Sequence, residues 1–283
     1  MAKKKADIKT DDECRPGLIK FELNLMDAVL DQLTPKIKDM EPLPLTEENT
    51  RALPEAQGVY QLFHEGQVKY VGKTDAKAGL RVRLTRHVSR LQQRDNIKPE
   101  DVQFKAVQIY VLTAMDIETE LIDRCGTKKN GWNGSSFGSN DPGRKRETTN
   151  KPPKGFDAQF PINIDIAFPF PLKGEQSVYN VLWNLKDALP YCFRYQTTNP
   201  ESSTGYKTAP EPEYITSSIV IPDRPVSVKE LLGMVVHALP NGWQATKFPS
   251  HVILYKEATK YAHGEVIQPI TPGPTEVLPE AAL

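Results

Sequence analysis

The spacing of hydrophobic residues predicts a β-hairpin followed by a helix. Residues 58–63 (GVYQLF) and 68–72 (VKYVG) are short runs rich in strand-forming residues, separated by the turn HEGQ. Residues 79–94 then repeat apolar side chains at the spacing of one helix face, at Leu80, Leu84, Val88 and Leu91. The pattern therefore changes from the period of strands to that of a helix within about forty residues.

Two further elements complete a small mixed domain. Residues 104–112 predict a third strand, and residues 114–123 predict a second helix. The stretch 125–153 is rich in Gly, Asn, Ser and basic residues, which is typical of a loop. Residues 58–133 are thus expected to fold in the order β-β-α-β-α.

The segment before the hairpin is less regular. Residues 21–33 predict an amphipathic helix, and a loop rich in Pro and Glu is expected to extend to about Gln57. Residues 1–19 have a basic run but no apolar segment after it, so we expect a flexible basic tail and no secretory signal. The first folded domain is assigned to residues 20–158.

The C-terminal part carries an internal repeat. The pattern Ser-Val, Leu, Ala-Leu-Pro at residues 177–190 recurs fifty positions later at residues 227–240. Each copy predicts a strand, a serine at the helix start, an amphipathic helix that stops at proline, and a second strand. Residues 159–262 are expected to form a second α+β domain built from two β-α-β repeats, and residues 263–283 a disordered tail. The strands are expected at residues 162–168, 191–196, 218–221, 243–248 and 252–255.

Composition is typical of a globular protein. Hydrophobic residues make up 39% of the 283 residues and charged residues 25%. No apolar run reaches the length of a membrane span, so no membrane association is expected. Three cysteines lie far apart, at Cys14, Cys125 and Cys192, which argues against a disulfide framework or a zinc knuckle and fits a reducing cytoplasm.

The charge distribution is uneven although the net charge is zero. Residues 69–98 contain nine Lys or Arg residues against two acidic ones. Such a basic stripe is typical of a surface that binds a polyanion. A solvated helix face would give the same pattern.

Several side chains in this region could carry chemistry. Tyr60 and Tyr70 are an even number of residues apart on paired strands, so both can point to one sheet face. Glu118 and Glu120 fall on nearly opposite sides of a helix. Glu118 shares the inward, apolar side, where a divalent cation would account for a carboxylate, as would an arginine partner. For the tyrosines, packing in a core is the alternative.

These residues lead to a family resemblance. The tripeptide GVY and the later YVGKT resemble the defining motif of the GIY-YIG nuclease superfamily, with Val59 and Val71 as mild substitutions. Arg83 and His87, four residues apart, resemble the second motif, and Glu118 in ETELI and Asn133 in NGWN resemble the later ones. The pattern WNGSSFGSNDPGRKR and the opening FELN resemble the type II restriction endonuclease branch. The resemblance covers about residues 20–165.

The resemblance implies a phosphodiesterase site. Its catalytic residues would be Tyr60, Tyr70, Lys73, Arg83, His87, Glu118 and Asn133. The first tyrosine would position or deprotonate the attacking water, and Glu118 would hold Mg²⁺ or Mn²⁺. Lys73 could lower the pKa of a tyrosine or accept its proton, and Arg83 would clamp a phosphate oxygen. His87 would orient the tyrosine or contact phosphate, and Asn133 would fix the loop beside the metal.

Other residues are candidates for DNA binding. Arginines of the helix and the basic loop would contact the backbone or read guanine, with a merely solvated loop as the alternative. This set comprises Arg86, Arg90, Arg94, Lys98, Asn140, Arg144, Lys145 and Arg146.

The sequence thus predicts a Mg²⁺-dependent endonuclease that acts on double-stranded DNA in restriction or antiphage defence. A structure-specific repair or recombination nuclease and an inactive DNA-binding protein are the alternatives. A palindromic target would imply a homodimer, since one such site cuts one strand. Residues 159–262 have a slight acidic excess, so a protein partner or self-association is expected there rather than DNA.

Overall fold

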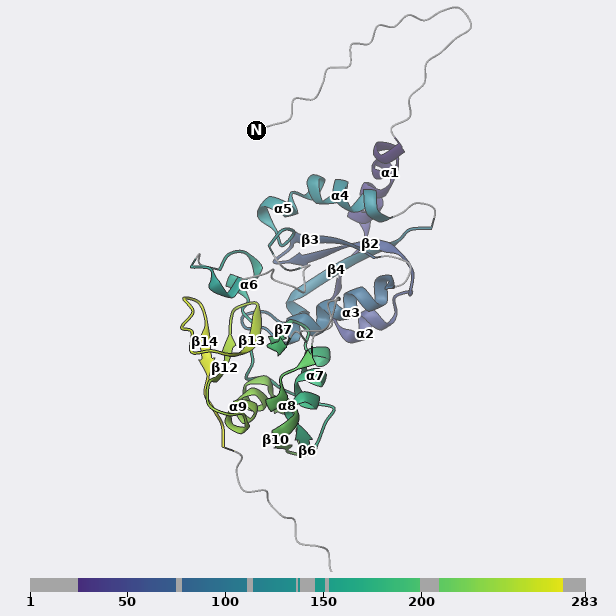
Figure 1. Cartoon of the computed structure of the whole chain (residues 1–283). Coiled ribbons are helices and arrows are strands. Elements are labelled where there is room, and N and C mark those ends of the chain that lie inside the picture. The colour runs from purple at the N-terminus through teal and green to yellow at the C-terminus, as the bar shows by residue number, and fades with distance from the viewer. Residues whose placement is uncertain are drawn as a thin grey trace, which may run out of the picture. The chain divides into compact units, whose positions relative to one another are not determined.

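The computed structural model describes residues 25–74, 78–110, 114–135, 137, 146–150, 153–198 and 209–271. The chain divides into two compact units, residues 1–40 and 41–283. In the first, helix α1 (Leu25–Asp39) ends later than the helix expected at residues 21–33 and continues past Pro35. The second combines helices with several small sheets, so the fold is α+β, as the sequence predicts (Figure 1).

A four-stranded antiparallel sheet organises the first part of the larger unit. Its strands are β1 (Leu43–Pro44), β2 (Gly58–His64), β3 (Gln67–Thr74) and β4 (Val102–Gln108), in the spatial order β1-β4-β2-β3. The expected hairpin of β2 and β3 is present. Its turn has positive φ at Glu65 (52°) and Gly66 (72°), as two-residue hairpin turns require. Strand β3 lies at the edge of the sheet.

Two helices cover opposite faces of this sheet (Figure 1). Helix α3 (Gly79–Gln92) packs on one face and buries the four apolar residues that the spacing predicts. Helix α4 (Ala114–Cys125) packs on the other face, where the side-chain amide of Gln61 donates a hydrogen bond to Cys125 Sγ at 3.3 Å. The predicted strands and helices from residue 58 to 125 are confirmed, although β4 ends at Gln108 and α3 at Gln92.

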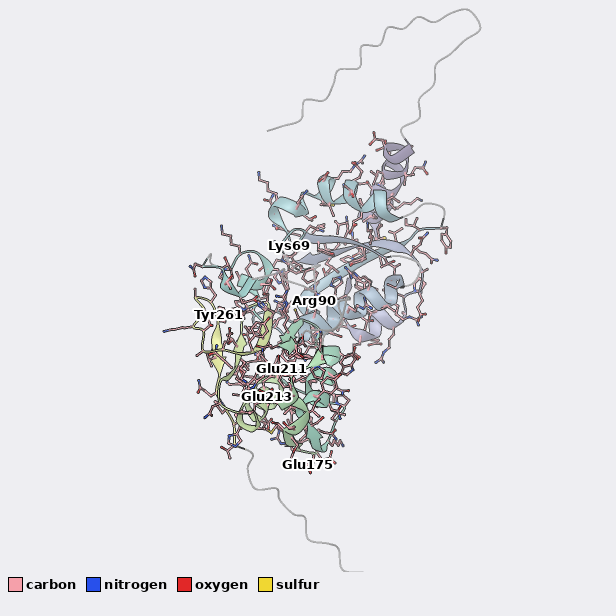
Figure 2. The ribbon with its side chains drawn as sticks, viewed as in Figure 1. Lys69, Arg90, Glu175, Glu211, Glu213 and Tyr261 are labelled. Carbon is pink, nitrogen blue, oxygen red and sulfur yellow. The ribbon has the colours of Figure 1, made fainter. Side chains whose placement is uncertain are left out.

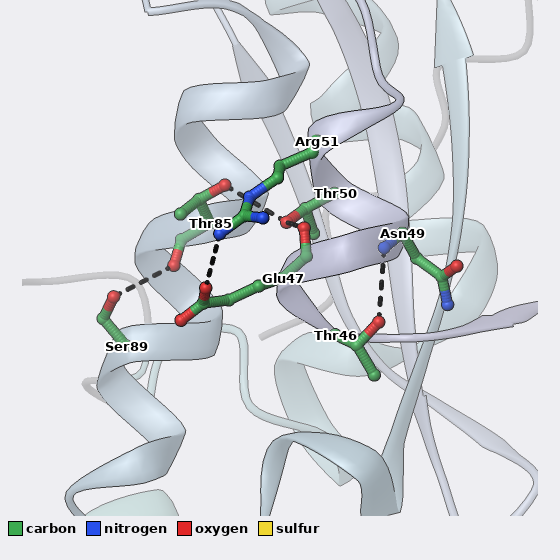
Figure 3. Close-up of polar contacts among 7 residues, drawn as sticks. All are labelled: Thr46, Glu47, Asn49, Thr50, Arg51, Thr85 and Ser89. Carbon is green, nitrogen blue, oxygen red and sulfur yellow. Dashed lines mark hydrogen bonds and ion pairs between the residues drawn. The ribbon is translucent and has the colours of Figure 1, made fainter.

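Short helices occupy segments for which the sequence predicts no regular element. They are α2 (Glu47–Arg51), η1 (Pro99–Asp101), α5 (Thr127–Asn130), η2 (Arg146–Thr148) and α6 (Phe156–Gln159). Thr46 caps α2 by accepting a hydrogen bond from the backbone N–H of Asn49 at 3.2 Å. The hydroxyl of Thr85 on α3 donates to that of Thr50 on α2 at 3.2 Å, so α2 supports α3 from the side (Figure 3).

A second hydrophobic cluster lies within residues 162–267, apart from the first cluster within residues 45–160. It contains the helices α7 (Val178–Ala188) and α9 (Val228–Ala238), each of 11 residues. Ser177 and Ser227 cap them, as the repeat predicts, by accepting hydrogen bonds from backbone N–H groups at 3.2 and 3.1 Å. The domain boundary expected at residue 158 lies two residues before Phe160, the last residue of the first cluster, and stays a prediction.

Small sheets surround these two helices. Their strands are β5 (Ala167–Phe168), β6 (Gly174–Ser177), β7 (Cys192–Tyr195), β8 (Thr197–Thr198), β9 (Ala209–Pro210), β10 (Ser218–Ile221), β11 (Val226–Ser227), β12 (Trp243–Lys247), β13 (His251–Lys256) and β14 (Glu265–Ile267), with helix α8 (Pro212–Thr216) ahead of β10. Strand β5 pairs with β11 and β6 pairs with β10. The strands that precede α7 therefore pair with the strands that precede α9. The third sheet has the order β14-β12-β13-β7.

The expectation of a disordered tail from residue 263 is wrong at its beginning. Strand β14 pairs with β12, and Ile267 is 4% exposed. Beyond it, the backbone N–H of Ile270 donates to the carbonyl of Gly233 on α9 at 2.9 Å. Ile267 is buried against the sheet, whereas Val266 is 41% exposed, and the low hydrophobicity of the segment did not predict a strand there. Residues 272–283 and the N-terminal tail lie outside the described residues.

No helix in the parts of the chain that the structure describes is both long and apolar enough to cross a membrane.

Candidate active site

The two tyrosines of the hairpin lie side by side on the sheet face that α3 covers. Tyr60 pairs with Gly72 and Leu62 pairs with Tyr70 in the strand register, so both phenols project from the same face. Their ring centroids are 6.1 Å apart. Tyr60 is 1% exposed and Tyr70 is 5% exposed. The common face that the spacing predicts is confirmed.

His87 on α3 reaches the first of these phenols. Its Nε2 lies 2.8 Å from the hydroxyl oxygen of Tyr60, and its ring stacks on that of Phe137 at 4.8 Å. Burial, followed by the nearby charges of Arg90 and Arg83, lowers the pKa of His87 well below its ordinary value, so the ring is neutral at pH 7. Because the side chain is buried, the structure favours orientation of the tyrosine over contact with phosphate.

Arg83 lies one turn earlier on α3 and joins both phenols. Its Nε donates a hydrogen bond to the hydroxyl of Tyr60 at 3.3 Å, and the nearby Tyr70 also acts on its pKa. Burial alone would lower the pKa of Arg83, but the two phenols outweigh burial and raise it. The guanidinium is therefore firmly cationic and held in place. A guanidinium has five N–H groups, so two phenol contacts leave others for an oxyanion.

The environment of Tyr60 raises its pKa. Burial is the main cause, Tyr70 adds to it, Arg83 opposes it, and Glu118 contributes weakly in the same direction as burial. The sequence suggested that Lys73 could lower the pKa of a tyrosine. The pKa of Tyr60 moves in the opposite direction, and Lys73 has a different partner. At neutral pH, Tyr60 is a phenol and not a phenolate.

Lys73 and Glu118 form an ion pair on the other face of the sheet. Lys73 pairs with Val59 in the strand register, so it projects toward α4, and its Nζ lies 3.1 Å from Glu118 Oε2. The Glu118 side chain is 18% exposed, whereas Glu120 is exposed, which agrees with the predicted orientation of the helix. Glu118 is near enough to Tyr60 to act on its pKa. Strand β3 lies at the edge of the sheet, so past Val71 a ligand at this edge could touch side chains from both faces.

Asn133 fixes the loop that follows α5 to this same strand. Its side-chain oxygen accepts a hydrogen bond from Val71 N at 2.8 Å, and its amide nitrogen donates to Val71 O at 2.8 Å. Next to it, Trp132 N donates to Lys69 O at 2.5 Å. The asparagine thus supplies the pair of bonds that a further strand would make, and its place agrees with the expected positioning role.

The donor set near the edge of β3 fits one kind of metal site. Glu118 offers a carboxylate, and Mg²⁺ binds with one or two carboxylates when phosphate oxygens and water complete its shell. The Lys73 ammonium engages one oxygen of that carboxylate, so a cation would have to share it. Within the described ranges, no three His, Cys, Asp or Glu side chains come together as a metal site.

The residues expected to bind DNA divide into three groups. Arg86 and Lys98 are exposed, as a DNA contact requires. Arg90 and Arg94 are each 8% exposed, which contradicts their expected position on the helix surface. Arg146 begins η2, but its side chain lies outside the described residues, as do Asn140, Arg144 and Lys145.

Arg94 has a structural partner that the sequence did not predict. Its Nη1 lies 2.8 Å from Asp157 Oδ1 and donates to Phe160 O at 2.6 Å, and its guanidinium lies 4.9 Å from the ring centroid of Phe156. Helix α3 ends at Gln92, so Arg94 turns into the space beside α6. No local sequence signal identifies Phe137 or Asp157 as neighbours of these arginines, because Phe137 lies in a loop and Asp157 in α6, both distant in the sequence.

Comparison with known proteins finds no similar protein: no family model, no curated protein and no solved structure matches the chain.

Proposed function

We propose that the chain is a Mg²⁺- or Mn²⁺-dependent endonuclease of the GIY-YIG type that hydrolyses phosphodiester bonds of double-stranded DNA. The observation that carries this proposal is the hydrogen bond from Arg83 to Tyr60 beside Tyr70, with the Glu118 carboxylate on the other face of the edge strand β3. Such hydrolysis requires a cation that binds the phosphate, a group that carries a proton, and a carboxylate that holds a divalent ion.

Arg83 is the group that binds the phosphate. Its planar fork can give two N–H groups to two oxygens of the scissile phosphate, and the charge that develops there in the transition state strengthens both bonds. The contacts with Tyr60 and Tyr70 hold the guanidinium before DNA arrives. Because the guanidinium is already oriented, it does not have to move during the reaction.

Tyr60 and His87 form a path for a proton. In the tautomer with an unprotonated Nε2, the Tyr60 hydroxyl donates to His87 across 2.8 Å. Tyr60 can then accept a proton from the attacking water while it passes its own to the imidazole, which must give the proton up again because burial lowers its pKa. A phenol with a raised pKa needs such a relay, because its phenolate is scarce at neutral pH. Asn133 keeps the strand that carries Tyr70 in place through Val71.

Glu118 is the residue that would hold the divalent ion, with Lys73 beside it. When bound, Mg²⁺ or Mn²⁺ would stabilise the phosphate charge and the leaving 3′ oxygen. The biological setting that fits double-strand cleavage is restriction or antiphage defence, which the resemblance to restriction endonucleases supports. A repeated sequence at the cut ends would support that setting, and cuts confined to branched DNA would favour a repair nuclease.

The test is cleavage of plasmid and phage DNA by the purified protein with Mg²⁺, with Mn²⁺ and with EDTA. We expect double-strand breaks that require a divalent ion. Glu118→Gln should lose cleavage and retain DNA binding. The matched control is Glu120→Gln on the exposed side of the same helix, which should cleave normally. Full activity of Glu118→Gln, or no cleavage by the unaltered protein with either ion, would overturn the proposal.

A further inference from the structure

A groove of about 490 Å³ lies between α3 and the segment that ends α7 and leads into β7. Arg86, Ser89 and Arg90 line one side, and residues 186–193 line the other. The two sides of the groove belong to different hydrophobic clusters, and hydrogen bonds link the two clusters. Asn163 N, for example, donates to Gln93 O at 3.0 Å.

The ionisable lining of the groove is mainly basic. Arg86 and Lys186 are exposed, and Arg90 is largely buried (labelled in Figure 2), against one acidic residue, Asp187, among the described lining residues. Lys186 Nζ lies 5.6 Å from the ring centroid of Tyr195, a contact that restricts its side chain. The lining therefore suits an anion.

Positive charge is crowded around Arg90. Burial, followed by the neighbouring guanidiniums of Arg94 and Arg83, lowers the pKa of Arg90 to about 10, although Asp157 partly offsets these charges. An anion in the groove would offset this repulsion, since opposite charges in a partly buried site interact strongly. Ser89 adds a hydroxyl to the same wall, although it donates its proton to Thr85 O at 3.3 Å (Figure 3).

The groove continues the line of the candidate active site along α3. Arg83 and Arg90 are seven residues apart, which places them on the same side of the helix and about 10 Å apart along its axis. A DNA strand advances about 3.4 Å along the duplex axis for each phosphate while it also winds around that axis, so successive phosphates lie farther apart than this rise. A phosphate one or two positions from the scissile one therefore falls at this separation. A strand held by Arg83 would thus bring another phosphate to the groove.

We propose that this groove binds a backbone phosphate of the DNA whose scissile phosphate Arg83 holds, with Lys186 as the contribution of the C-terminal part of the chain. The inference rests on the proposed function and extends it. The slight acidic excess of residues 159–262 led us to expect no DNA contact there. Lys186 would be the exception, because it lines the groove. The ligand is a phosphodiester, and the contact carries no sequence information.

The test measures binding of a short labelled duplex to the Glu118→Gln protein over a series of salt concentrations. Lys186→Gln should weaken binding alike for every DNA sequence and should reduce the slope of log affinity against log salt by about one. Asp187→Asn should tighten binding. The control is Lys260→Gln, which removes the same charge from another exposed site in the C-terminal part and should leave the slope unchanged.

The outcomes separate the two proposals. Equal slopes for Lys186→Gln and Lys260→Gln, on a protein that binds duplex DNA, would overturn the groove and leave the endonuclease standing. Absence of duplex binding by the folded parent, together with absence of cleavage by the unaltered protein, would overturn both. A lower slope for Lys186→Gln alone supports the groove.

Discussion

Gly72 lies directly against the ring of Tyr60. A Cβ atom at residue 72 would be 2.4 Å from both Cζ and the hydroxyl oxygen of Tyr60, and 2.7 Å from Cε1 of Tyr70. The two residues are register partners on β2 and β3, so the phenol folds across the glycine backbone. The last residue of the YVG tripeptide therefore makes room for the aromatic groups that hold Arg83.

Gly72→Ala should displace the Tyr60 ring and thereby the hydroxyl that contacts Arg83 and His87. We expect a loss of about 1–3 kcal/mol in the free energy of unfolding, the usual range for an overpacked site, and a clear loss of cleavage. Urea unfolding and cleavage assays measure both. In a Tyr60→Leu background, the same substitution should destabilise the protein much less. An equal loss in both backgrounds would contradict contact with the phenol.

The pKa of His87 predicts how stability depends on pH. Burial lowers it in the folded state, whereas in the unfolded chain it is about 6.5. The unfolded state therefore takes up the proton first as pH falls, and stability that is present above about pH 6.5 is lost below it. The slope from this one group is at most about 1.4 kcal/mol per pH unit.

Urea unfolding between pH 7.5 and 5 tests this dependence. His87→Gln should be less stable at pH 7.5 because the partner of Tyr60 is lost, but its stability should fall less steeply below pH 6.5. The difference should correspond to about one proton. Parallel curves for the two proteins would show that His87 is not the group responsible.

Residue spacing predicted the pairs that share one element or one hairpin. Tyr60 and Tyr70 lie on adjacent strands, and Arg83 and His87 lie one turn apart on α3, so period and register place them. Lys73 was assigned to the same phenols, but one residue beyond Gly72 the side chain points to the opposite face. The register of β2 against β3 determines which face Lys73 occupies, and that register is known only from the structure.

The arginines of α3 and of the turn after it show why other positions could not be predicted. Arg86, Arg90 and Arg94 have the same charge and nearly the same spacing, yet one is exposed and two are buried. The difference arises from α6 and residue 137, which come from later in the chain and pack beside the end of α3. Local pattern contains no information about such distant partners.

The buried ion pair of Arg94 and Asp157 should be sensitive to loss of one member. Their side chains are 5% and 7% exposed, so Asp157→Asn leaves a buried guanidinium without its counter-charge. We expect a loss of about 3–5 kcal/mol in the free energy of unfolding. The exposed pair Glu47–Arg51 is the control, and Glu47→Gln should have little effect. The double variant Arg94→Met/Asp157→Leu should be more stable than Asp157→Asn; the reverse order would contradict the charge argument.

Lys73→Met tests whether the ammonium competes with a divalent ion for Glu118. Removal of a positive charge 3.1 Å from the carboxylate should strengthen cation binding. The Mg²⁺ concentration that gives half-maximal cleavage should therefore fall. Lys69→Met removes the same charge from the same strand, where Nζ donates to Gln67 Oε1, and should leave that concentration unchanged. A higher Mg²⁺ requirement for Lys73→Met would argue that the lysine assists the ion.

Arg83→Ala tests the group on which the proposed chemistry depends most. If this guanidinium stabilises the transition-state phosphate, its removal should lower the single-turnover cleavage rate at least about a hundredfold, the scale of one lost donor. Arg83→Lys keeps the charge but not the fork, so it should recover only part of the rate. Arg86→Ala, on the exposed side of the same helix, should weaken DNA binding more than it slows the chemical step. A rate loss under about threefold for Arg83→Ala would exclude the clamp, because a preorganised donor contributes more than that.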